Sequence, residues 1–263
     1  MAIPIIPWMG GKRRLANYLI PKFPPHKTYV EVFAGGAAIY MLRPPAEVEI
    51  LNDTHGELVR LYRVVQNHLE EFVRCMKYSL ASRQMFEWFK QAQPETLTDI
   101  QRAVRFFYLQ QYAYGAKVSG QTWGTSATTP PVNLLRIEET LSAAHLRLSG
   151  AYIENLDWYP LMSKYDRPTT FFYLDPPYWE VTGYGVEFGI EQYEKMANLV
   201  GNLQGRAIIS LNDHPDMRRI FKQFDIDAVP IKYHVGGAHH IVERSELVIF
   251  SWDRSTDPVG LFQ

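Results

Sequence analysis

Hydrophobic positions along the chain fall into short apolar runs and into longer stretches with apolar residues three or four positions apart. Short runs rich in β-branched and aromatic residues predict strands, whereas the wider spacing predicts amphipathic helices. The predicted strands lie at residues 28–33, 47–51, 152–155, 171–174, 206–211, 231–234 and 246–252. The predicted helices lie at residues 13–20, 38–42, 58–91, 97–112 and 133–145.

The order of these elements predicts an α/β fold with an insertion. Two strands come early, a mostly helical block follows, and strands then resume. A chain of 263 residues is long enough for a core domain with an insertion. We expect the core at residues 1–56 and 146–263 and the insertion at residues 57–145, with a long loop or hairpin near residues 112–133. Long loops of this kind are commonly functional.

The composition is that of an ordinary globular protein, with 46% hydrophobic and 21% charged residues. No apolar run approaches the roughly 18 residues of a membrane span, and no basic segment followed by an apolar one begins the chain. We therefore expect neither a membrane protein nor a secreted one. The single cysteine, Cys75, excludes an intrachain disulfide and fits a reducing compartment.

Charge is unevenly distributed, although the net charge is only −1. Residues 101–137 carry four basic residues and no acid, which gives +4 there and −5 for the remainder. These residues are Arg102, Arg105, Lys117 and Arg136. A nucleic-acid backbone can use such a surface, and the alternative is a solvated helix face.

An acid, two prolines and an aromatic residue follow the apolar run at residues 171–174. They are Asp175, Pro176, Pro177 and Tyr178. Consecutive prolines supply no backbone N–H, so strand pairing stops there while their carbonyls remain acceptors. Open α/β sheets bind ligands at the carboxyl ends of their strands. The Asp175 carboxylate and the Pro176 carbonyl can accept both hydrogens of an exocyclic amino group, and Tyr178 can stack on the base. The alternative is a turn after a core strand, with Tyr178 covering apolar surface.

A second motif joins a glycine turn to an acid. Gly35 and Gly36 follow the first predicted strand, and Asp53 follows the second, 18 residues after Gly35. Glycines let the backbone approach a ligand closely, and an acid about 20 residues further on can bind ribose hydroxyls. This spacing favours nucleoside binding over a plain turn.

Together with the N-terminal segment from Trp8 to Lys12, these motifs have the order and spacing of a known family. The chain resembles the Dam-type DNA adenine methyltransferases of bacteria and their phages over nearly its whole length. The resemblance implies an α/β, Rossmann-like, S-adenosylmethionine-dependent methyltransferase sheet with an inserted, mostly helical target-recognition domain. It also implies transfer of a methyl group from S-adenosylmethionine to the exocyclic N6 of an adenine flipped out of double-stranded DNA.

The same resemblance assigns roles to individual residues. Cofactor binding is expected from Trp8, Lys12, Phe33, Gly35, Gly36, Asp53 and Asp175, with Asp53 on the ribose. Catalysis is expected from Asp175, Pro176, Pro177 and Tyr178. Contacts to DNA are expected from Arg102, Arg105, Lys117, Gln121, Trp123 and Arg136.

The chain departs from the family pattern at two places, and the second of them leaves the target sequence open. Ala37 stands where family members often carry glycine, and residues 120–125 differ from the recognition hairpin of GATC-specific members. No metal is expected, because His234, His239 and His240 lack clustered acids and are expected in a loop near DNA. The resemblance implies action in the cytoplasm of a bacterial cell or of a phage-infected host.

Other functions remain open at this stage. An amino-methyltransferase can act on cytosine N4, on adenine in RNA or on a glutamine side chain, but cytosine enzymes usually carry serine and glutamine enzymes asparagine where this chain has Asp175. A non-catalytic nucleic-acid-binding module would leave the Asp-Pro-Pro-Tyr segment without a purpose, as would a nicotinamide-dependent oxidoreductase.

Overall fold

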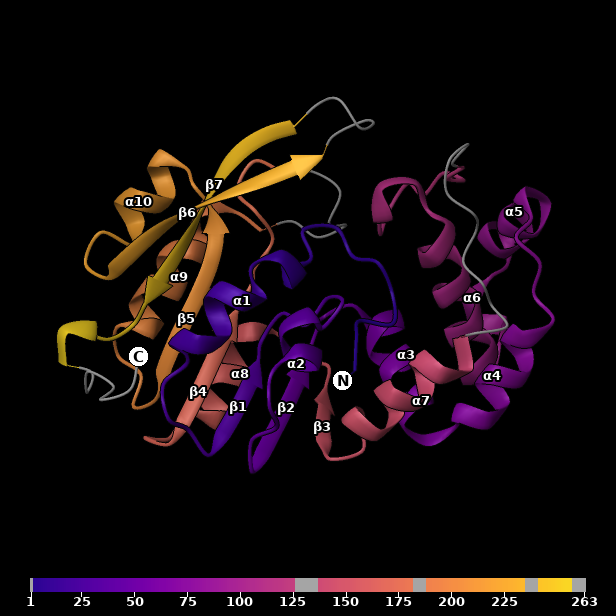
Figure 1. Cartoon of the computed structure of the whole chain (residues 1–263), viewed down its shortest axis with the longest axis horizontal. Helices are drawn as coiled ribbons and strands as arrows, with labels where there is room; N and C mark the ends of the chain where they lie inside the picture. The colour runs from indigo at the N-terminus through magenta and orange to yellow at the C-terminus, as the bar shows by residue number, and fades with distance from the viewer. Residues whose placement is uncertain (1, 126–136, 182–187, 235–240, 257–263) are drawn as a thin grey trace.

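A computed structural model of the chain describes residues 2–125, 137–181, 188–234 and 241–256. Within these ranges, seven strands form one sheet in the order β3-β2-β1-β4-β5-β7-β6 (Figure 1). The strands are β1 (Thr28–Glu31), β2 (Val48–Asn52), β3 (Ala151–Glu154), β4 (Thr170–Leu174), β5 (Arg206–Asn212), β6 (Asp225–His234) and β7 (Ile241–Phe250). The predicted α/β class and the Rossmann-like sheet are confirmed.

The sheet is parallel from β3 to β5 and ends in an antiparallel ribbon. β1 pairs in parallel with β2 on one side and β4 on the other, whereas β7 runs antiparallel to both β5 and β6. All five residues of β4 are buried, as expected for a continuous apolar run in a sheet covered on both faces. The carboxyl ends of β1, β2 and β4 therefore meet at one edge of the sheet.

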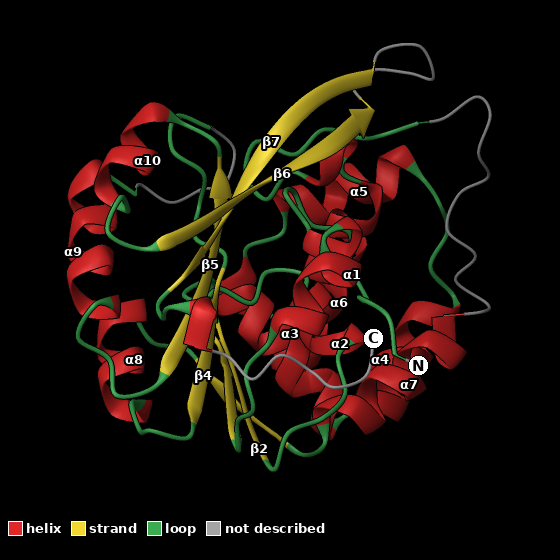
Figure 2. Ribbon diagram, turned by 60° about the vertical axis from the view of Figure 1, so that its left-hand side comes forward, coloured by secondary structure: helices red, strands yellow, loops and turns green. Residues whose placement is uncertain are grey.

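Helices cover both faces of the sheet and enclose two apolar clusters (Figure 2). On one face lie α8 (Trp158–Tyr165), α9 (Ile190–Val200) and α10 (Pro215–Ile220). On the other face lie α1 (Ala16–Leu19), α2 (Ala38–Leu42) and the first helix of the helical block.

The helical block lies between β2 and β3 in the chain and gathers at one side of the sheet (Figure 1). Its helices are α3 (Gly56–Asn67), α4 (Leu69–Lys77), α5 (Arg83–Gln91), α6 (Asp99–Tyr112) and α7 (Ile137–Leu148). The helical pattern predicted at residues 58–91 is thus three helices, because the chain leaves helical geometry at His68 and again after Tyr78. The first four residues of the helix predicted at residues 133–145 lie outside the described ranges. The division into two domains stays a prediction.

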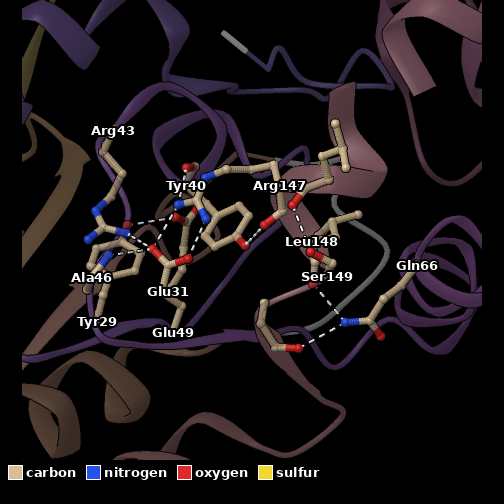
Figure 3. A network of polar contacts seen from close by, with 12 residues as sticks. Tyr29, Glu31, Tyr40, Arg43, Ala46, Glu49, Gln66, Arg147, Leu148 and Ser149 are labelled. Carbon is tan, nitrogen blue, oxygen red and sulfur yellow. Dashed lines mark hydrogen bonds and ion pairs between the residues drawn. The ribbon is translucent and has the colours of Figure 1, made fainter. Parts of the chain in front are cut away.

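A buried ion-pair cluster connects the last helix of this block to the sheet (Figure 3). Glu49 of β2 is 4% exposed and accepts hydrogen bonds from Arg43, which follows α2, and from Arg147 of α7. Arg147 also donates to the Tyr40 carbonyl at 3.0 Å. Burial raises the pKa of Glu49. The hydrogen bonds from Arg147 and from the Ala46 N–H, together with the charges of both arginines, outweigh burial and leave this pKa below its ordinary value. The cluster fixes the end of α7 against the start of β2.

Candidate active site

A cavity of about 300 Å³ opens at the carboxyl ends of the parallel strands. Its walls come from the N-terminal turn, the β1–α2 turn and the segments that follow β2, β3 and β4. The seven residues predicted to bind the cofactor all line it: Trp8, Lys12, Phe33, Gly35, Gly36, Asp53 and Asp175. Residues from four separate segments therefore converge where open α/β sheets bind nucleotides.

The glycine turn lies directly against an indole ring. Gly35 has φ of +46°, and a Cβ atom there would lie 2.5 Å from Nε1 of Trp8. At Gly36 a Cβ atom would lie 3.0 Å from the Trp8 Cβ. Tyr62 of α3 holds the turn in place, since its hydroxyl donates a hydrogen bond to the Gly35 carbonyl at 2.5 Å. Both glycines are needed for this close approach.

Ala37 occupies the position where the family resemblance leads one to expect glycine. Its φ of +51° and ψ of +38° are left-handed, and it precedes α2 as the N-cap residue. A residue with a Cβ costs about 1–2 kcal/mol in this conformation. The departure noted in the sequence thus falls on a backbone position that favours glycine.

Asp53 ties the glycine turn to the end of β2. Its Oδ2 accepts the Gly35 N–H at 2.9 Å and its Oδ1 accepts the His55 N–H at 2.8 Å. Burial raises the pKa of Asp53, while the two amide hydrogen bonds oppose that shift. Each carboxylate oxygen retains a second lone pair, so Asp53 can also accept a hydroxyl from a ligand in the cavity.

The acid after β4 is paired with a buried lysine. Lys12 is 4% exposed, and its Nζ lies 2.5 Å from Oδ1 of Asp175. Nζ also donates to the Gly10 carbonyl at 3.2 Å and lies 4.4 Å from the centre of the Tyr178 ring. Burial raises the pKa of Asp175 to about 6 despite the opposing charge of Lys12.

Neighbouring elements hold the segment that follows β4 in place. The Tyr193 hydroxyl of α9 donates to the Pro177 carbonyl. The Asn212 side chain accepts the Trp179 N–H at 3.1 Å and donates to the Trp179 carbonyl at 3.2 Å. Among the described residues no hydrogen bond to the Pro176 carbonyl occurs. Pro176 is buried and is not among the residues that line the cavity, so its role as an acceptor stays a prediction.

Several residues that line the cavity were not anticipated from the sequence. They are Glu31, Thr54, His55, Asp157, Trp158, Phe188 and Gln192, among others. Trp158 donates to Gln192 at 3.1 Å, which joins α8 to α9 across the cavity wall. Asp157 could have been predicted in the same way as Asp53, because it is an acid shortly after a predicted strand. Phe188 and Gln192 follow no strand and gave no such signal.

Glu31 is a buried acid in the floor of the cavity. It is 2% exposed, and its Oε2 accepts the Tyr29 hydroxyl at 2.7 Å. Burial raises its pKa to about 8, and the negative charge of Asp175 contributes to that shift. Both effects favour the protonated form of Glu31.

Two of the predicted DNA-contacting arginines have partners within the helical block. Arg102 forms an ion pair with Glu57, and its Nε donates to that carboxylate at 3.0 Å. Arg105 Nε donates to the Phe89 carbonyl at 2.6 Å. Both side chains help to hold helices together, and a role in DNA binding stays a prediction for each. Arg136 lies outside the described residues.

In the described part of residues 112–133 the chain turns back on itself, and the full extent of the predicted hairpin stays a prediction. The Tyr114 N–H donates to the Thr122 carbonyl at 2.8 Å, and an antiparallel bridge joins Ala113 to Trp123. The remainder, from residue 126 onward, lies outside the described ranges. Lys117 is exposed at the hairpin, which is the position its predicted contact with DNA requires.

The other two hairpin residues face inward. The Trp123 ring stacks on Tyr112 with ring centres 5.1 Å apart and packs edge-on against Phe86. The Gln121 side chain donates to the Gln110 side chain at 3.1 Å and to the Lys117 carbonyl at 2.9 Å. These contacts anchor the hairpin to α5 and α6, and contacts of both residues with DNA stay predictions.

Two general features complete the description. In the part of the chain that the structure describes, no three residues among histidine, cysteine, aspartate and glutamate come together in a group that could hold a metal ion. Of the three histidines expected in a loop, His234 is instead the last residue of β6, and His239 and His240 lie outside that part. No described helix is long and apolar enough to cross a bilayer.

A Rossmann-like sheet with a glycine turn, a following acid and an Asp-Pro-Pro-Tyr segment at the same edge defines a methyltransferase class. Residues 8–235 match the model of the D12 class N6 adenine-specific DNA methyltransferases. Since the match spans most of the chain, the protein belongs to this family and is a DNA adenine methyltransferase. The acceptor is thus adenine in DNA rather than cytosine, RNA or glutamine, and the alternatives of a binding module and an oxidoreductase are not supported.

Individual relatives agree with this assignment. The chain is 26% identical over 260 residues to the Type II methyltransferase M.CviBI of Paramecium bursaria Chlorella virus NC1A, covering 94% of this chain and 98% of the relative. It is 25% identical over 224 residues to the DNA adenine methylase of Haemophilus influenzae, covering 79% and 77%. A DNA adenine methylase of Salmonella typhi is 31% identical over 117 residues, covering 41% and 40%.

Proposed function

We propose that the cavity binds S-adenosylmethionine and that the protein methylates an adenine flipped out of double-stranded DNA. The observation that carries this proposal is the convergence of all seven predicted cofactor residues on one cavity, where Lys12 pairs with Asp175 and lies 4.4 Å from the centre of the Tyr178 ring. S-adenosylmethionine supplies an electrophilic methyl group on a positively charged sulfur.

The residues that line the cavity fit this cofactor chemically. The Gly35–Gly36 turn packs against Trp8 more closely than a Cβ atom would allow, and all three residues line the cavity. The spare lone pairs of Asp53 suit the two ribose hydroxyls. Asp157, in the wall formed by the β3–α8 connection, can accept a hydrogen bond from the exocyclic amino group of the cofactor adenine. The volume of about 300 Å³ is at the lower end of small-molecule sites.

The segment after β4 fits the amino group of the target base. An adenine stacked in a duplex cannot reach this site, so it must leave the helix. Asp175 and the Pro176 carbonyl then accept one hydrogen bond each from the N6 amino group. These two hydrogen bonds turn the nitrogen lone pair towards the methyl group. Tyr178 stacks on the base and limits its rotation. Positioning of this kind supplies much of the rate in a direct displacement.

One proton leaves N6 when the new C–N bond forms. Asp175 is placed to accept that proton, because its raised pKa of about 6 makes it a better base than an ordinary aspartate. The ion pair with Lys12 must loosen as Asp175 takes up the amino group. No covalent enzyme intermediate is needed for this route.

We assign recognition of the DNA target to residues 57–145. The helical block lies to one side of the sheet (Figure 1), and its hairpin carries the exposed Lys117. The Glu49–Arg147 ion pair fixes α7 relative to the sheet, which would keep a bound duplex in register with the site. This division of labour supports a catalytic unit formed by residues 1–56 and 146–263.

Cofactor binding and base flipping test the proposal separately. Titration calorimetry with S-adenosylhomocysteine should give a one-to-one complex with the wild type and a much weaker one with Asp53→Ala. A duplex carrying 2-aminopurine at the target adenine should fluoresce more strongly when the wild type binds it, since the base leaves the stack. Equal affinity in both proteins would remove Asp53 from the site, and unchanged fluorescence would argue against flipping.

A further inference from the structure

Glu246 of β7 is a buried acid beside the catalytic segment that the mechanism above does not use. It is 1% exposed and pairs across the ladder with Asn212 of β5. Both of its carboxylate oxygens lie 2.5 Å from the Tyr178 hydroxyl, which donates to them. A charged acceptor makes this hydrogen bond stronger than one between neutral groups. The far end of the Tyr178 ring is therefore tethered to the sheet.

Glu246 also lies near the cation of the site. Its Oε2 is 4.0 Å from Nζ of Lys12, while the same Nζ is 2.5 Å from Oδ1 of Asp175. The ammonium group thus lies between two carboxylates, and it stands 4.4 Å from the centre of the Tyr178 ring. Four side chains from the N-terminal turn, the segment after β4 and strand β7 form one connected cluster.

The cluster has two consequences for methyl transfer. A ring whose hydroxyl is anchored has a fixed plane, so less rotational freedom is lost when a base stacks on it. When Asp175 accepts the amino hydrogens of the base, its bond to Lys12 weakens. Glu246 then keeps a negative charge beside the buried ammonium, which would otherwise lose its partner at a high cost in free energy.

We propose that Glu246 is a positioning residue for methyl transfer, which fixes the Tyr178 ring and retains Lys12 while Asp175 engages the base. The proposal rests on the proposed roles of Asp175 and Tyr178. It predicts that substitutions of Glu246 slow the chemical step through Tyr178. If Glu246 only stabilised the fold, its substitution would lower stability, and its effect on the rate would not depend on Tyr178.

Single-turnover methylation of a DNA duplex in Glu246→Gln, Glu246→Ala, Tyr178→Phe and the double variants tests the idea. Glu246→Ala should slow the step by about tenfold or more, and Glu246→Gln, which keeps an acceptor for the hydroxyl, should recover part of that loss. In the Tyr178→Phe background, which lacks the hydroxyl, both substitutions at residue 246 should have a several-fold smaller effect. Glu71→Gln, at an exposed acid of α4, serves as the control and should match the wild type.

The outcomes distinguish a failure of the role of Glu246 from a failure of the proposed function. Equal effects in the wild-type and Tyr178→Phe backgrounds, or unchanged rates in all Glu246 variants, would overturn the inference while leaving the proposed function standing. If the wild type itself methylates no adenine, the proposed function fails. Should Glu246→Ala not fold, the coupling between Glu246→Gln and Tyr178→Phe still decides the matter.

Discussion

Gly35→Ala tests the link between the glycine turn and the cofactor. Gly35 has φ of +46°, and the added methyl group would lie 2.5 Å from Nε1 and 2.7 Å from Cδ1 of Trp8. No real Cβ atom tolerates such distances, so the indole or the turn must move. Left-handed geometry alone costs an alanine about 1–2 kcal/mol.

The expected effect on affinity follows from these numbers. If the bound state requires the wild-type turn, that strain is subtracted from the binding free energy. A loss of about 1–2 kcal/mol corresponds to a five- to thirtyfold higher Kd, and displacement of Trp8 adds to it. Titration calorimetry with S-adenosylhomocysteine measures the change directly.

Gly115→Ala is the matched control. Gly115 has φ of +68°, but a Cβ atom there meets nothing within 4 Å, and the residue does not line the cavity. The control should lose stability by a similar amount and keep its affinity for the cofactor. If Gly35→Ala binds S-adenosylhomocysteine within twofold of the wild type, the close packing of Trp8 on the turn is not part of the cofactor site.

Three further predictions address the site, the fold and the DNA surface. Because Asp175 must be ionised and its pKa is raised to about 6, the single-turnover rate should fall as pH drops through about 6, and a flat profile between pH 5 and 7 would contradict this. Glu49→Gln leaves the buried Arg43 and the partly buried Arg147 without their counter-ion, so urea unfolding should show a free energy of unfolding lower by about 3–5 kcal/mol. The native pKa of Glu49 is lowered, so its contribution to stability is present above the ordinary value of 4.5 and is lost as pH falls through the native pKa. Lys117→Ala should weaken DNA binding for every sequence and reduce the slope of log K against log salt by about 1, and an unchanged slope would remove Lys117 from the interface.

The strands of the core could be predicted because buried parallel strands are continuous apolar runs. Residues 171–174 are the clearest case, and β4 covers them. The terminal ribbon was harder to delimit, since β6 begins at Asp225 rather than at the predicted residue 231. The start of β6 alternates acids with apolar residues at the edge of the sheet, so it lacks the apolar run of a core strand. Likewise, apolar spacing at residues 58–91 marked the buried face of the helices but not the breaks between them.

The candidate site shows a similar division. Glycine turns and acids at strand ends can be recognised from the local sequence. This pattern correctly predicted that Gly35, Asp53 and Asp175 lie at the carboxyl ends of the strands. Glu246 gave no signal, because it follows the polar residues 243–245 and is itself the first residue of the predicted strand. It meets Tyr178 only through the pairing of β7 with β5. Contacts across the sheet or between helices cannot be predicted before the fold is known. The ion pair of Arg102 with Glu57 is a second example.

Methylation of genomic DNA by the wild type and by Asp175→Asn tests the central claim most directly. Each protein is incubated with S-adenosylmethionine and unmethylated DNA, and the nucleosides are quantified by mass spectrometry. We predict N6-methyladenine from the wild type and a rate at least about 100- to 1000-fold lower from the variant, because asparagine has a single oxygen acceptor and no charge. The variant should still bind S-adenosylhomocysteine, which shows that the fold is intact. Comparable N6-methyladenine from both proteins would contradict the role of Asp175, and none from the wild type would contradict the proposed reaction.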